Sequence, residues 1–379
     1  MSFGFAFSPG TGFEGGGPPP VDVQVQITQT ALVEAIASVI PGSTLVTPVG
    51  EWLATEGITL GQTMKAAGTS PPAVTLTLTG GGSVALNTSN LRANGGIKVE
   101  IDSVAGGTAR GQATFRVSYN NGSTWAHSGV TTAATYDLDG GASGMRLNFP
   151  TGTYGTSQNW QATVETWTSA DGLNRTFTNA TAGQQPIYEV AGMDGGPCLL
   201  FDGVDDRLHN TDAAMYAPFT NGHAFTLWAR ITFTIADRAG SFFSAANSGS
   251  ANGCRSFGQT SVGNGRHIDI YLNDSGGTAN SIRTTPELDS VSGGGTYSAH
   301  TVEWSFESNL STCQVEGDTA NPNGASFTPG TLTPNRCTIG AQGKSTPANF
   351  FLGRMSQLLV WDQKLNSTQA SDWRTELPP

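Results

Sequence analysis

Charged residues are scarce in this chain, and basic residues are scarcer than acidic ones. Only 12% of the 379 residues are charged, and 18 Lys and Arg stand against 29 Asp and Glu, which gives a net charge of −11. No segment gathers Lys and Arg into a cluster. Binding to nucleic acid or to an anionic membrane surface requires such a positive patch. We therefore expect neither as a partner.

Long hydrophobic runs are also missing. No segment reaches the roughly 18 consecutive apolar residues that a membrane-spanning helix needs. The N-terminal residues lack the basic start and the continuous apolar stretch of a secretory signal peptide. The sequence therefore predicts no membrane span and no signal peptide, and a chain that is made in the cytoplasm and kept there until the cell lyses.

Cysteine is absent from the first half of the chain. The second half contains Cys198, Cys254, Cys313 and Cys337 at wide spacings, without the C-x-x-C or Cys/His spacing of a zinc site. One interpretation is that all four are buried free thiols. The other is that one or two disulfides form after release from the cell, and the sequence does not determine their pairing.

Turn-forming residues are abundant, whereas helical patterns are few. The chain has 50 Gly and 19 Pro, with Thr, Ser and Asn between short apolar runs, which is typical of an all-β protein. Its length allows two or three domains. We place an N-terminal attachment region at 1–71, a central β-sandwich at 72–168, a polar linker at 169–183 and a second, larger sandwich at 184–379.

The N-terminal region predicts an arm followed by a strand and the one helix expected in the chain. The phenylalanines make residues 1–20 too apolar for a free linker, so one interpretation is an arm that docks on a neighbour. The alternative is a loose tail, because chain termini are usually poorly ordered. Residues 21–27 alternate apolar and polar side chains, which predicts a strand. Residues 30–42 have a helical apolar stripe with an N-cap and a Pro-Gly stop.

Period-2 alternation dominates the rest of the chain. Short alternating runs occupy 73–82, 96–104, 111–125, 144–154 and 159–167, and Asn121-Gly122 is a strong hairpin signal. In 224–235 the alternation predicts Phe225, Leu227, Ala229, Ile231 and Phe233 on one inward face. The segments 267–274 and 300–308 alternate in the same way. Such strands predict two antiparallel sheets packed face to face.

Several motifs carry a resemblance to a known family. QQPIYEVAGMDGGPCLLFDGVDDRL, FTLWARITF, TIGAQG and FLGRMSQLLVWDQKLNSTQASDW follow one another over residues 184–374. Their order resembles the concanavalin A-like, laminin-G-type jelly roll of bacterial surface proteins and bacteriophage virion proteins. The segment 109–154 is similar to a β module of phage tail and particle-surface proteins. The resemblance implies a virion structural protein with a central sandwich and a C-terminal jelly roll.

Three acids follow an apolar run in LLFDGVDDRL. Asp202, Asp205 and Asp206 stand where the chain must reverse, and Asp favours such turns because its carboxylate accepts backbone N–H groups. The alternative is a metal site, for which Ca²⁺ is the candidate ion. Ca²⁺ takes six or more oxygens, so these residues would supply only part of its ligands. We favour the turn and expect no certain cofactor.

Enzymatic chemistry is disfavoured by the residues. Glycoside hydrolysis needs two carboxylates across one bond, and the strand at 267–274 has no glutamate. Glu303 and Glu307 share a strand face but would lie about 13 Å apart. No G-x-S-x-G elbow and no phosphate-binding loop is present. We expect no catalytic residues.

A binding face is easier to support. The polar positions Trp228, Arg230, His267, Asp269 and Tyr271 combine aromatic rings with hydrogen-bonding groups that suit a sugar. The plain alternatives are a solvated sheet face and a face covered by a neighbouring subunit.

The sequence thus predicts a non-enzymatic virion structural protein that decorates a particle surface or contacts a host glycan. We expect it to bind other virion proteins through its N-terminal region and to form a homo-oligomer, with a trimer favoured by the resemblance. A bacterial carbohydrate-binding or adhesin module is the alternative, and a glycan-degrading enzyme is a more distant one. The place on the particle, whether capsid, collar, tail or baseplate, is left open.

Overall fold

The structure is a computed structural model that describes most of the chain from residue 48 onward. The described residues are 48–55, 57–67, 71–86, 96–141, 144–220, 222–233, 240–250, 254–262, 265–273, 279–283, 299–308, 310–315, 323–326 and 332–376. Their regular structure is mostly β, and all named strands pair antiparallel. The predicted all-β class is therefore confirmed. The predicted arm, first strand and helix at 1–20, 21–27 and 30–42 lie outside the described residues.

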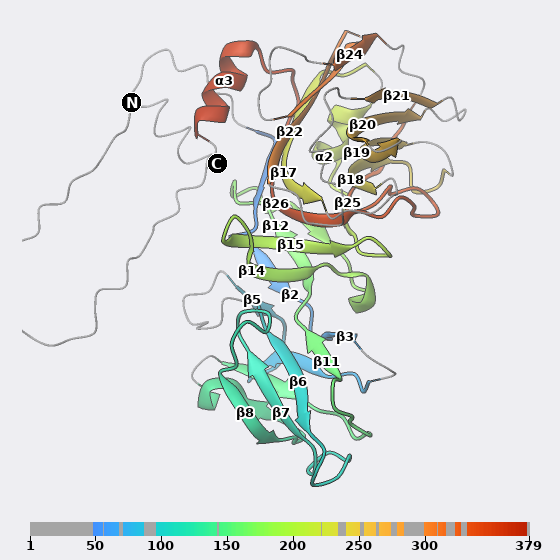
Figure 1. The fold of residues 1–379 in the computed structure, drawn as a ribbon. Coiled ribbons are helices and arrows are strands. Elements are labelled where there is room, and N and C mark those ends of the chain that lie inside the picture. Colours follow the sequence, from blue (N-terminus) through green and yellow to red (C-terminus); the bar gives the residue numbers. More distant parts are fainter. Residues whose placement is uncertain are drawn as a thin grey trace, which may run out of the picture.

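Two large sheets pack face to face and form the jelly-roll body, which occupies the upper part of Figure 1. The first has eight strands in the order β14 (Ile187–Met193), β15 (Gly196–Asp202), β26 (Leu352–Trp361), β17 (Phe225–Phe233), β22 (His300–Glu307), β23 (Leu310–Val315) and β24 (Asn323–Ser326), with β1 (Gly50–Leu53) beside β26. The second has ten, in the order β21 (Ala279–Arg283), β20 (Gly265–Asn273), β19 (Cys254–Val262), β18 (Gly240–Ala246), β25 (Arg336–Ile339), β16 (Leu208–Asn210), β13 (Thr176–Thr178), β12 (Val164–Thr168), β2 (Ile58–Leu60) and β5 (Val84–Ala85).

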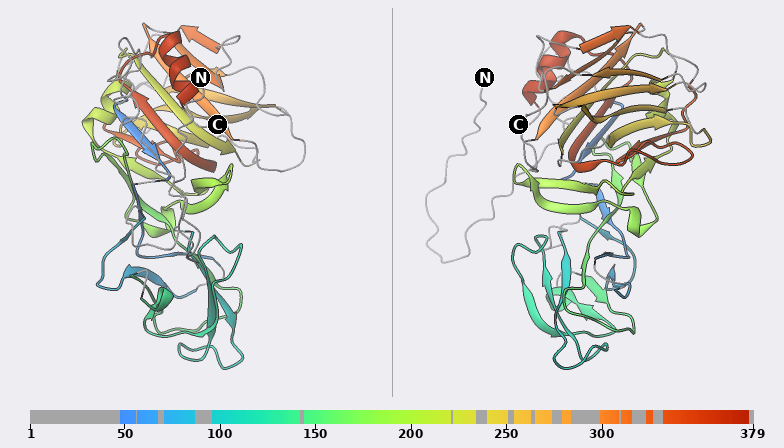
Figure 2. Two further views of the ribbon diagram at one scale, coloured as in Figure 1. Left: turned by 90° about the vertical axis from the view of Figure 1, so that its left-hand side faces the viewer. Right: turned by 45° about the vertical axis from the view of Figure 1, so that its right-hand side comes forward.

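A second, smaller unit lies below the jelly-roll body, and we call it the small sandwich (Figures 1 and 2). One of its sheets contains β4 (Thr75–Leu78), β10 (Met145–Asn148) and β9 (Tyr136–Asp137). The other contains β3 (Lys65–Ala67), β11 (Asn159–Gln161), β6 (Lys98–Ser103), β7 (Thr114–Ser118) and β8 (His127–Thr131). The predicted hairpin is present, since β7 pairs with β8 and both Asn121 and Gly122 adopt positive φ between them, at 55° and 96°.

Strand alternation places the apolar side chains as expected. Phe225, Leu227 and Ile231 of β17 are fully buried between the large sheets, together with Trp304 of β22. The rings of Phe225 and Trp304 meet edge to face with centroids 4.7 Å apart, an arrangement that aromatic pairs prefer.

The chain crosses between the two bodies more than once, so the bodies do not follow the order of the sequence. β2 and β5 flank β3 and β4 along the chain, yet they pair with the ten-stranded sheet. The predicted linker 169–183 contains β13, which pairs with β12 and β16. Its polar, turn-rich composition comes from the hairpin loop 169–175. The jelly-roll body thus draws on residues well before the predicted start at 184.

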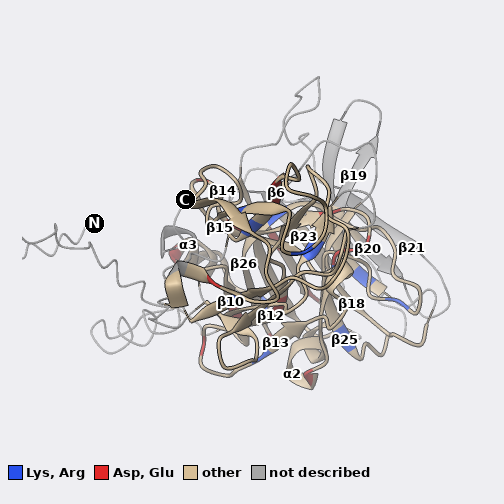
Figure 3. Ribbon diagram, turned by 90° about the horizontal axis from the view of Figure 1, so that it is seen from below, with Lys and Arg blue, Asp and Glu red and all other residues tan. Residues whose placement is uncertain are grey.

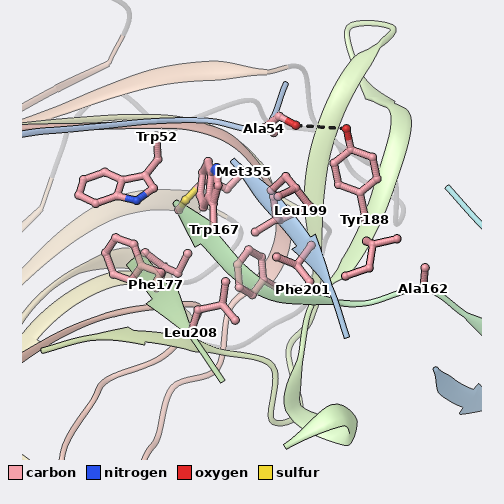
Figure 4. Close-up of a cluster of buried hydrophobic side chains, with 14 of the residues drawn as sticks. Trp52, Ala54, Ala162, Trp167, Phe177, Tyr188, Leu199, Phe201, Leu208 and Met355 are labelled. Carbon is pink, nitrogen blue, oxygen red and sulfur yellow. Dashed lines mark hydrogen bonds between the residues drawn. The ribbon is translucent and has the colours of Figure 1, made fainter. Parts of the chain in front are cut away.

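Aromatic residues from these early strands fill one end of the jelly-roll core (Figure 4). Trp52 of β1 and Phe177 of β13 pack edge to face at 5.0 Å, and Trp167 of β12 is fully buried near them. The hydroxyl of Tyr188 donates to the carbonyl of Ala54 at 3.2 Å. Burying a tryptophan removes about 200 Å² from water and stabilises by roughly 5 kcal/mol, so β1 and β12 are integral to this core.

Helices are short in the described part of the chain. α2 (Ala213–Tyr216) is capped at its N-terminus by Asp212, whose carboxylate accepts from the Ala214 backbone N–H at 2.9 Å. It is followed by the 3₁₀ turn η3 (Ala217–Phe219); two others are η1 (Leu138–Gly141) and η2 (Ala182–Gln184). α3 (Ser367–Glu376) lies on the outer face of the eight-stranded sheet. None of these helices is long and apolar enough to cross a membrane.

Candidate functional site

The three acids of LLFDGVDDRL form a tight turn between β15 and β16, which we call the acid turn. Oxygens of Asp202, Asp205 and Asp206 lie within 4.8 Å of one another. One carboxylate oxygen of Asp202 accepts from the backbone N–H groups of Val204, at 2.7 Å, and Asp205, at 3.3 Å. This is the hydrogen bonding that aspartate provides in a turn.

A lysine from the small sandwich pairs with two of the three acids of the acid turn. Nζ of Lys65, in β3, lies 2.9 Å from Asp202 and 2.7 Å from Asp206. Asp206 is fully buried, and its second oxygen accepts from the Asp202 backbone N–H at 3.0 Å. Sequence reasoning missed Lys65 because it stands 137 residues before Asp202. The acid turn therefore joins the two bodies by charge.

Burial and charge act against each other in this cluster. Burial raises the pKa of Asp206 to about 7, although Lys65 acts in the opposite direction. Burial alone would also raise the pKa of Asp202, but hydrogen bonds from the Val204 N–H and from Lys65 hold it below its usual value. Burial alone would lower the pKa of Lys65, and the two carboxylates raise it instead.

The acid turn does not fit Ca²⁺ as it is arranged. Asp202 and Asp206 each use an oxygen on the Lys65 ammonium, and their remaining oxygens accept backbone N–H groups. A calcium ion would have to displace this ammonium and still find three or more further oxygens. We therefore derive no metal chemistry from this cluster.

The predicted binding face is divided between the two large sheets. Trp228 and Arg230 belong to β17 of the eight-stranded sheet, whereas His267, Asp269 and Tyr271 belong to β20 of the ten-stranded sheet. The prediction that the five share one face is therefore wrong. The side chains of the three β20 residues lie outside the described part, so their role in binding stays a prediction.

Trp228 is not available to a ligand. Its side chain does point away from the core between the sheets, as predicted, but it is only 1% exposed because α3 covers it. Its ring lies 5.4 Å from that of Trp361, which in turn lies 5.3 Å from Trp373 of α3. The sequence signal for this helix is its N-terminal cap. The Asn366 backbone N–H donates to Oε1 of Gln369 and the Gln369 backbone N–H donates to Oδ1 of Asn366, each at 2.9 Å, a reciprocal cap that an N-x-x-Q spacing can indicate.

Arg230 forms an ion pair with a neighbouring turn. Its guanidinium lies 2.5 Å from the carboxylate of Asp194, which occupies the tight Asp194-Gly195 turn between β14 and β15 with φ of 50° and 78°. An Asp-Gly pair between two strands is itself a hairpin signal. Arg230 thus stabilises a turn, and its positive charge is already paired with the carboxylate of Asp194.

Other acids of the described region are also paired with basic residues. Glu189 lies 2.6 Å from Arg354, and Glu100 lies 2.6 Å from Arg116. Asp137 holds Arg146 at 2.5 Å, which lowers the pKa of the carboxyl. Charges of both signs are spread over the ribbon in Figure 3.

The four cysteines are buried free thiols, as one of the two interpretations predicted. Burial, followed by the charge of Glu189, raises the pKa of Cys198. A thiol with a raised pKa is a poor nucleophile, so Cys198 serves packing.

A cavity of about 340 Å³ lies at the β12, β2 and β5 end of the ten-stranded sheet, and we call it the threonine pocket. It is within the size range of small-ligand sites. The described residues of its lining are uncharged: Gly57, Thr59, Ala85, Thr168, Ser169, Ala170, Gly172 and Asn174. No residue of this lining was singled out from the sequence, because three separate segments contribute to it.

The hairpin loop 169–175 forms one wall of the threonine pocket and is held by its own hydrogen bonds. The Ser169 N–H donates to the Arg175 carbonyl at 2.8 Å, and the Arg175 N–H donates to the Ser169 hydroxyl at 3.0 Å. Gly172 and Asn174 adopt positive φ, at 78° and 53°. The loop is therefore ordered without a ligand.

Comparisons with known proteins show a limited likeness. No protein-family model and no curated protein matches this chain. Among solved structures, a mutant of the NanB sialidase from Streptococcus pneumoniae is 13% identical, over 46% of this chain and 27% of that one, with a TM-score of 0.35. The Ruminococcus gnavus IT-sialidase CBM40 bound to α2,6 sialyllactose is 15% identical, over 40% of this chain and 84% of that one, with a TM-score of 0.33.

A native heptameric SAP-like pentraxin from Limulus polyphemus is 17% identical, over 45% of this chain and 78% of that one, with a TM-score of 0.34. This chain thus spans about a quarter of the NanB sialidase. A likeness at these values carries no argument about function, which has to come from the residues themselves.

Proposed function

We propose that this chain is a non-enzymatic structural protein of a phage or phage-like particle, which displays its jelly-roll body for surface decoration or contact with a host glycan. The motifs of residues 184–374 resemble a jelly roll of bacterial surface proteins and bacteriophage virion proteins, and the similarity of segment 109–154 to a β module of phage tail and particle-surface proteins supports the particle setting. The observation that best supports a non-enzymatic role is the pairing of the acid turn with Lys65.

Hydrolysis of a glycosidic bond requires one carboxylic acid and one carboxylate facing the same bond. Oxygens of Asp202 and Asp206 lie within 4.8 Å of each other, and both carboxylates are held by one ammonium group. Glu303 is 7% exposed, and Glu307 lies 3.7 Å from Lys364. These acids support the proposal that the chain binds without cleaving.

Two assays with the purified chain test this proposal. Incubation with polysaccharide from the host surface should release no new reducing ends, whereas an array of oligosaccharides should retain the chain. Shortened oligosaccharides would show an enzyme and reject the non-enzymatic proposal. Retention of no glycan would reject glycan contact.

The particle setting has its own test. We propose that the N-terminal region binds other virion proteins and that the chain assembles as a homo-oligomer, with a trimer favoured. Deleting residues 1–20 should leave the β bodies folded but abolish incorporation into particles. Electron microscopy of purified particles would locate the protein, and its absence from particles would favour the bacterial adhesin alternative.

A further inference from the structure

We infer that the threonine pocket binds an uncharged sugar ring. This inference rests on the proposed glycan contact and adds the place and the ligand class. The pocket is an open cavity of about 340 Å³. It lies away from β17 and β20, which carry the residues first predicted to bind a sugar.

The hydroxyl groups of the pocket are available for hydrogen bonding. Thr59 is flanked by core residues in β2, and Thr168 follows a core residue in β12. Because successive side chains of a strand point to opposite faces, both threonine side chains face outward into the pocket. Neither hydroxyl makes a hydrogen bond to another described residue. The amide of Asn174 donates to the Gly172 carbonyl at 3.3 Å and keeps its oxygen as an acceptor. Hydroxyls both donate and accept, which matches the alternating needs of sugar hydroxyls.

Charge selects against an ionised ligand. Among the described residues, no Asp, Glu, Lys, Arg or His lines the pocket. Asp171, in the same loop, accepts from the Ser169 hydroxyl at 2.7 Å and the Leu173 N–H at 2.9 Å, and its other oxygen is buried without a partner. Arg175 is directed to Asp212 at 3.3 Å. An anionic sugar would find no counter-charge and would be repelled by Asp171.

The pocket is ordered before binding, which lowers the entropy cost of association. The Thr168 N–H donates to the Gly57 carbonyl at 2.8 Å, and the Ala170 N–H donates to the Glu51 carbonyl at 2.7 Å. These bonds tie the loop to β1 and to the turn before β2. The wall therefore does not have to fold around the ligand.

Apolar contact in the pocket is modest. The methyl groups of Ala85 and Ala170 line it, and Leu173 of the same loop is 55% exposed. They can contact the C–H face of a sugar ring, but the part of the lining that the structure describes includes no aromatic ring for stacking. We therefore expect weak binding at each site, strengthened by display of many copies on one particle.

The test uses the full chain on an array that contains neutral and acidic oligosaccharides. The variants Thr168→Val and Asn174→Gly each remove one polar group while keeping strand propensity or the left-handed backbone. Thr176→Val is the matched control, because Thr176 pairs with Thr168 in the neighbouring strand, is exposed and does not line the pocket. We expect the array to retain the chain on neutral glycans. This retention should fall about five- to tenfold in either pocket variant and should be unchanged in the control.

The outcomes separate this inference from the proposed function. Glycan retention that is equal in the pocket variants and the control would move the site elsewhere and overturn the inference, while glycan contact would stand. Retention of acidic glycans alone would also overturn it. Retention of no glycan would reject both. Because the described lining has no titratable side chain, neutral-glycan binding should also be flat between about pH 5 and pH 8, and a steep pH profile would contradict the assignment.

Discussion

Individual residues of this chain carry structural roles that their neighbours in sequence do not reveal. Lys65 is the clearest case. It is 19% exposed, and its ammonium faces one partly exposed and one fully buried carboxylate. Removing one partner of such a group leaves a buried charge uncompensated, which costs more than the pair itself contributes.

At about pH 8, above the pKa of about 7 of Asp206, we expect Lys65→Met to lower the free energy of unfolding by about 3 kcal/mol, because the ionised Asp206 would lose its counter-charge. Denaturant-induced unfolding of the full chain measures this. Lys98→Met is the control, since Lys98 lies 4.0 Å from Glu100 in a more exposed pair, and it should cost less than about 1 kcal/mol. Equal losses in the two variants would show that the acid turn does not depend on Lys65.

His209 predicts a pH dependence of stability. Burial, followed by the charges of Arg336 and Arg207, lowers its pKa to about 3, whereas an unfolded histidine titrates near pH 6.5. Between these values the unfolded state binds the additional proton, so stability falls as the pH decreases from about 6.5 towards 3. His209→Asn, which can keep the bond to the Thr338 hydroxyl seen at 2.9 Å, should lose this part of the acid sensitivity.

The measurement is the difference in unfolding free energy between the parent and His209→Asn at several pH values. Taking the difference matters because the raised pKa of Asp206 has the opposite sign, and its contribution decreases as the pH rises from about 4 to 7. A difference that does not change with pH would show that His209 is not the titrating group.

Among the elements, α3 changes which side chains of the eight-stranded sheet are exposed to solvent. It turns an outward tryptophan of β17 into part of a small hydrophobic cluster with members Trp228, Leu359, Trp361, Leu365, Ala370 and Trp373. The Leu365 N–H also donates to the Thr226 hydroxyl at 2.9 Å, which anchors the segment before the helix. The helix therefore belongs to the jelly-roll body.

We expect Trp373→Ala to destabilise the chain by about 3–5 kcal/mol and to expose Trp228 and Trp361. Denaturant unfolding gives the first quantity, and acrylamide quenching of tryptophan fluorescence gives the second. Leu173→Ala changes an exposed side chain and should cost no more than about 0.5 kcal/mol. Unchanged quenching in Trp373→Ala would mean that α3 does not protect the sheet face.

At the scale of the whole molecule, polar contacts at two places help to hold the small sandwich against the jelly-roll body. One is the acid turn with Lys65. The other is Asn121, at the tip of the β7–β8 hairpin, whose amide donates to the Tyr188 carbonyl at 2.9 Å and accepts from the Val190 N–H at 3.3 Å. The two bodies also share one continuous hydrophobic cluster.

Replacing Asn121 separates its two roles. Asn121→Gly keeps the left-handed backbone at φ 55° but loses the side-chain bonds to β14, so we expect a loss of about 1–2 kcal/mol. Asn121→Ala adds backbone strain of about 1 kcal/mol. Thermal unfolding of both variants should rank alanine below glycine. The reverse order would show that the positive φ contributes nothing.

Some features could be predicted from the sequence because they depend on local chemistry. The strand alternation of β17 and β22, the Asn121-Gly122 turn and the turn at Asp202 each involve residues within a few positions of one another. Their side-chain period or backbone preference specifies them without knowledge of distant segments. The all-β class follows from the same local patterns repeated along the chain.

Only the tertiary structure decided which side chains are exposed and which of them come together in a site. Pairing of Lys65 with Asp206, cover of Trp228 by α3 and the meeting of three segments at the threonine pocket all join residues that are far apart in the chain. Alternation predicts that a side chain points away from the core between the sheets. Whether that side chain then meets water, a helix or another sheet depends on packing. For this protein, local chemistry determined the strands and turns, and long-range packing determined the site.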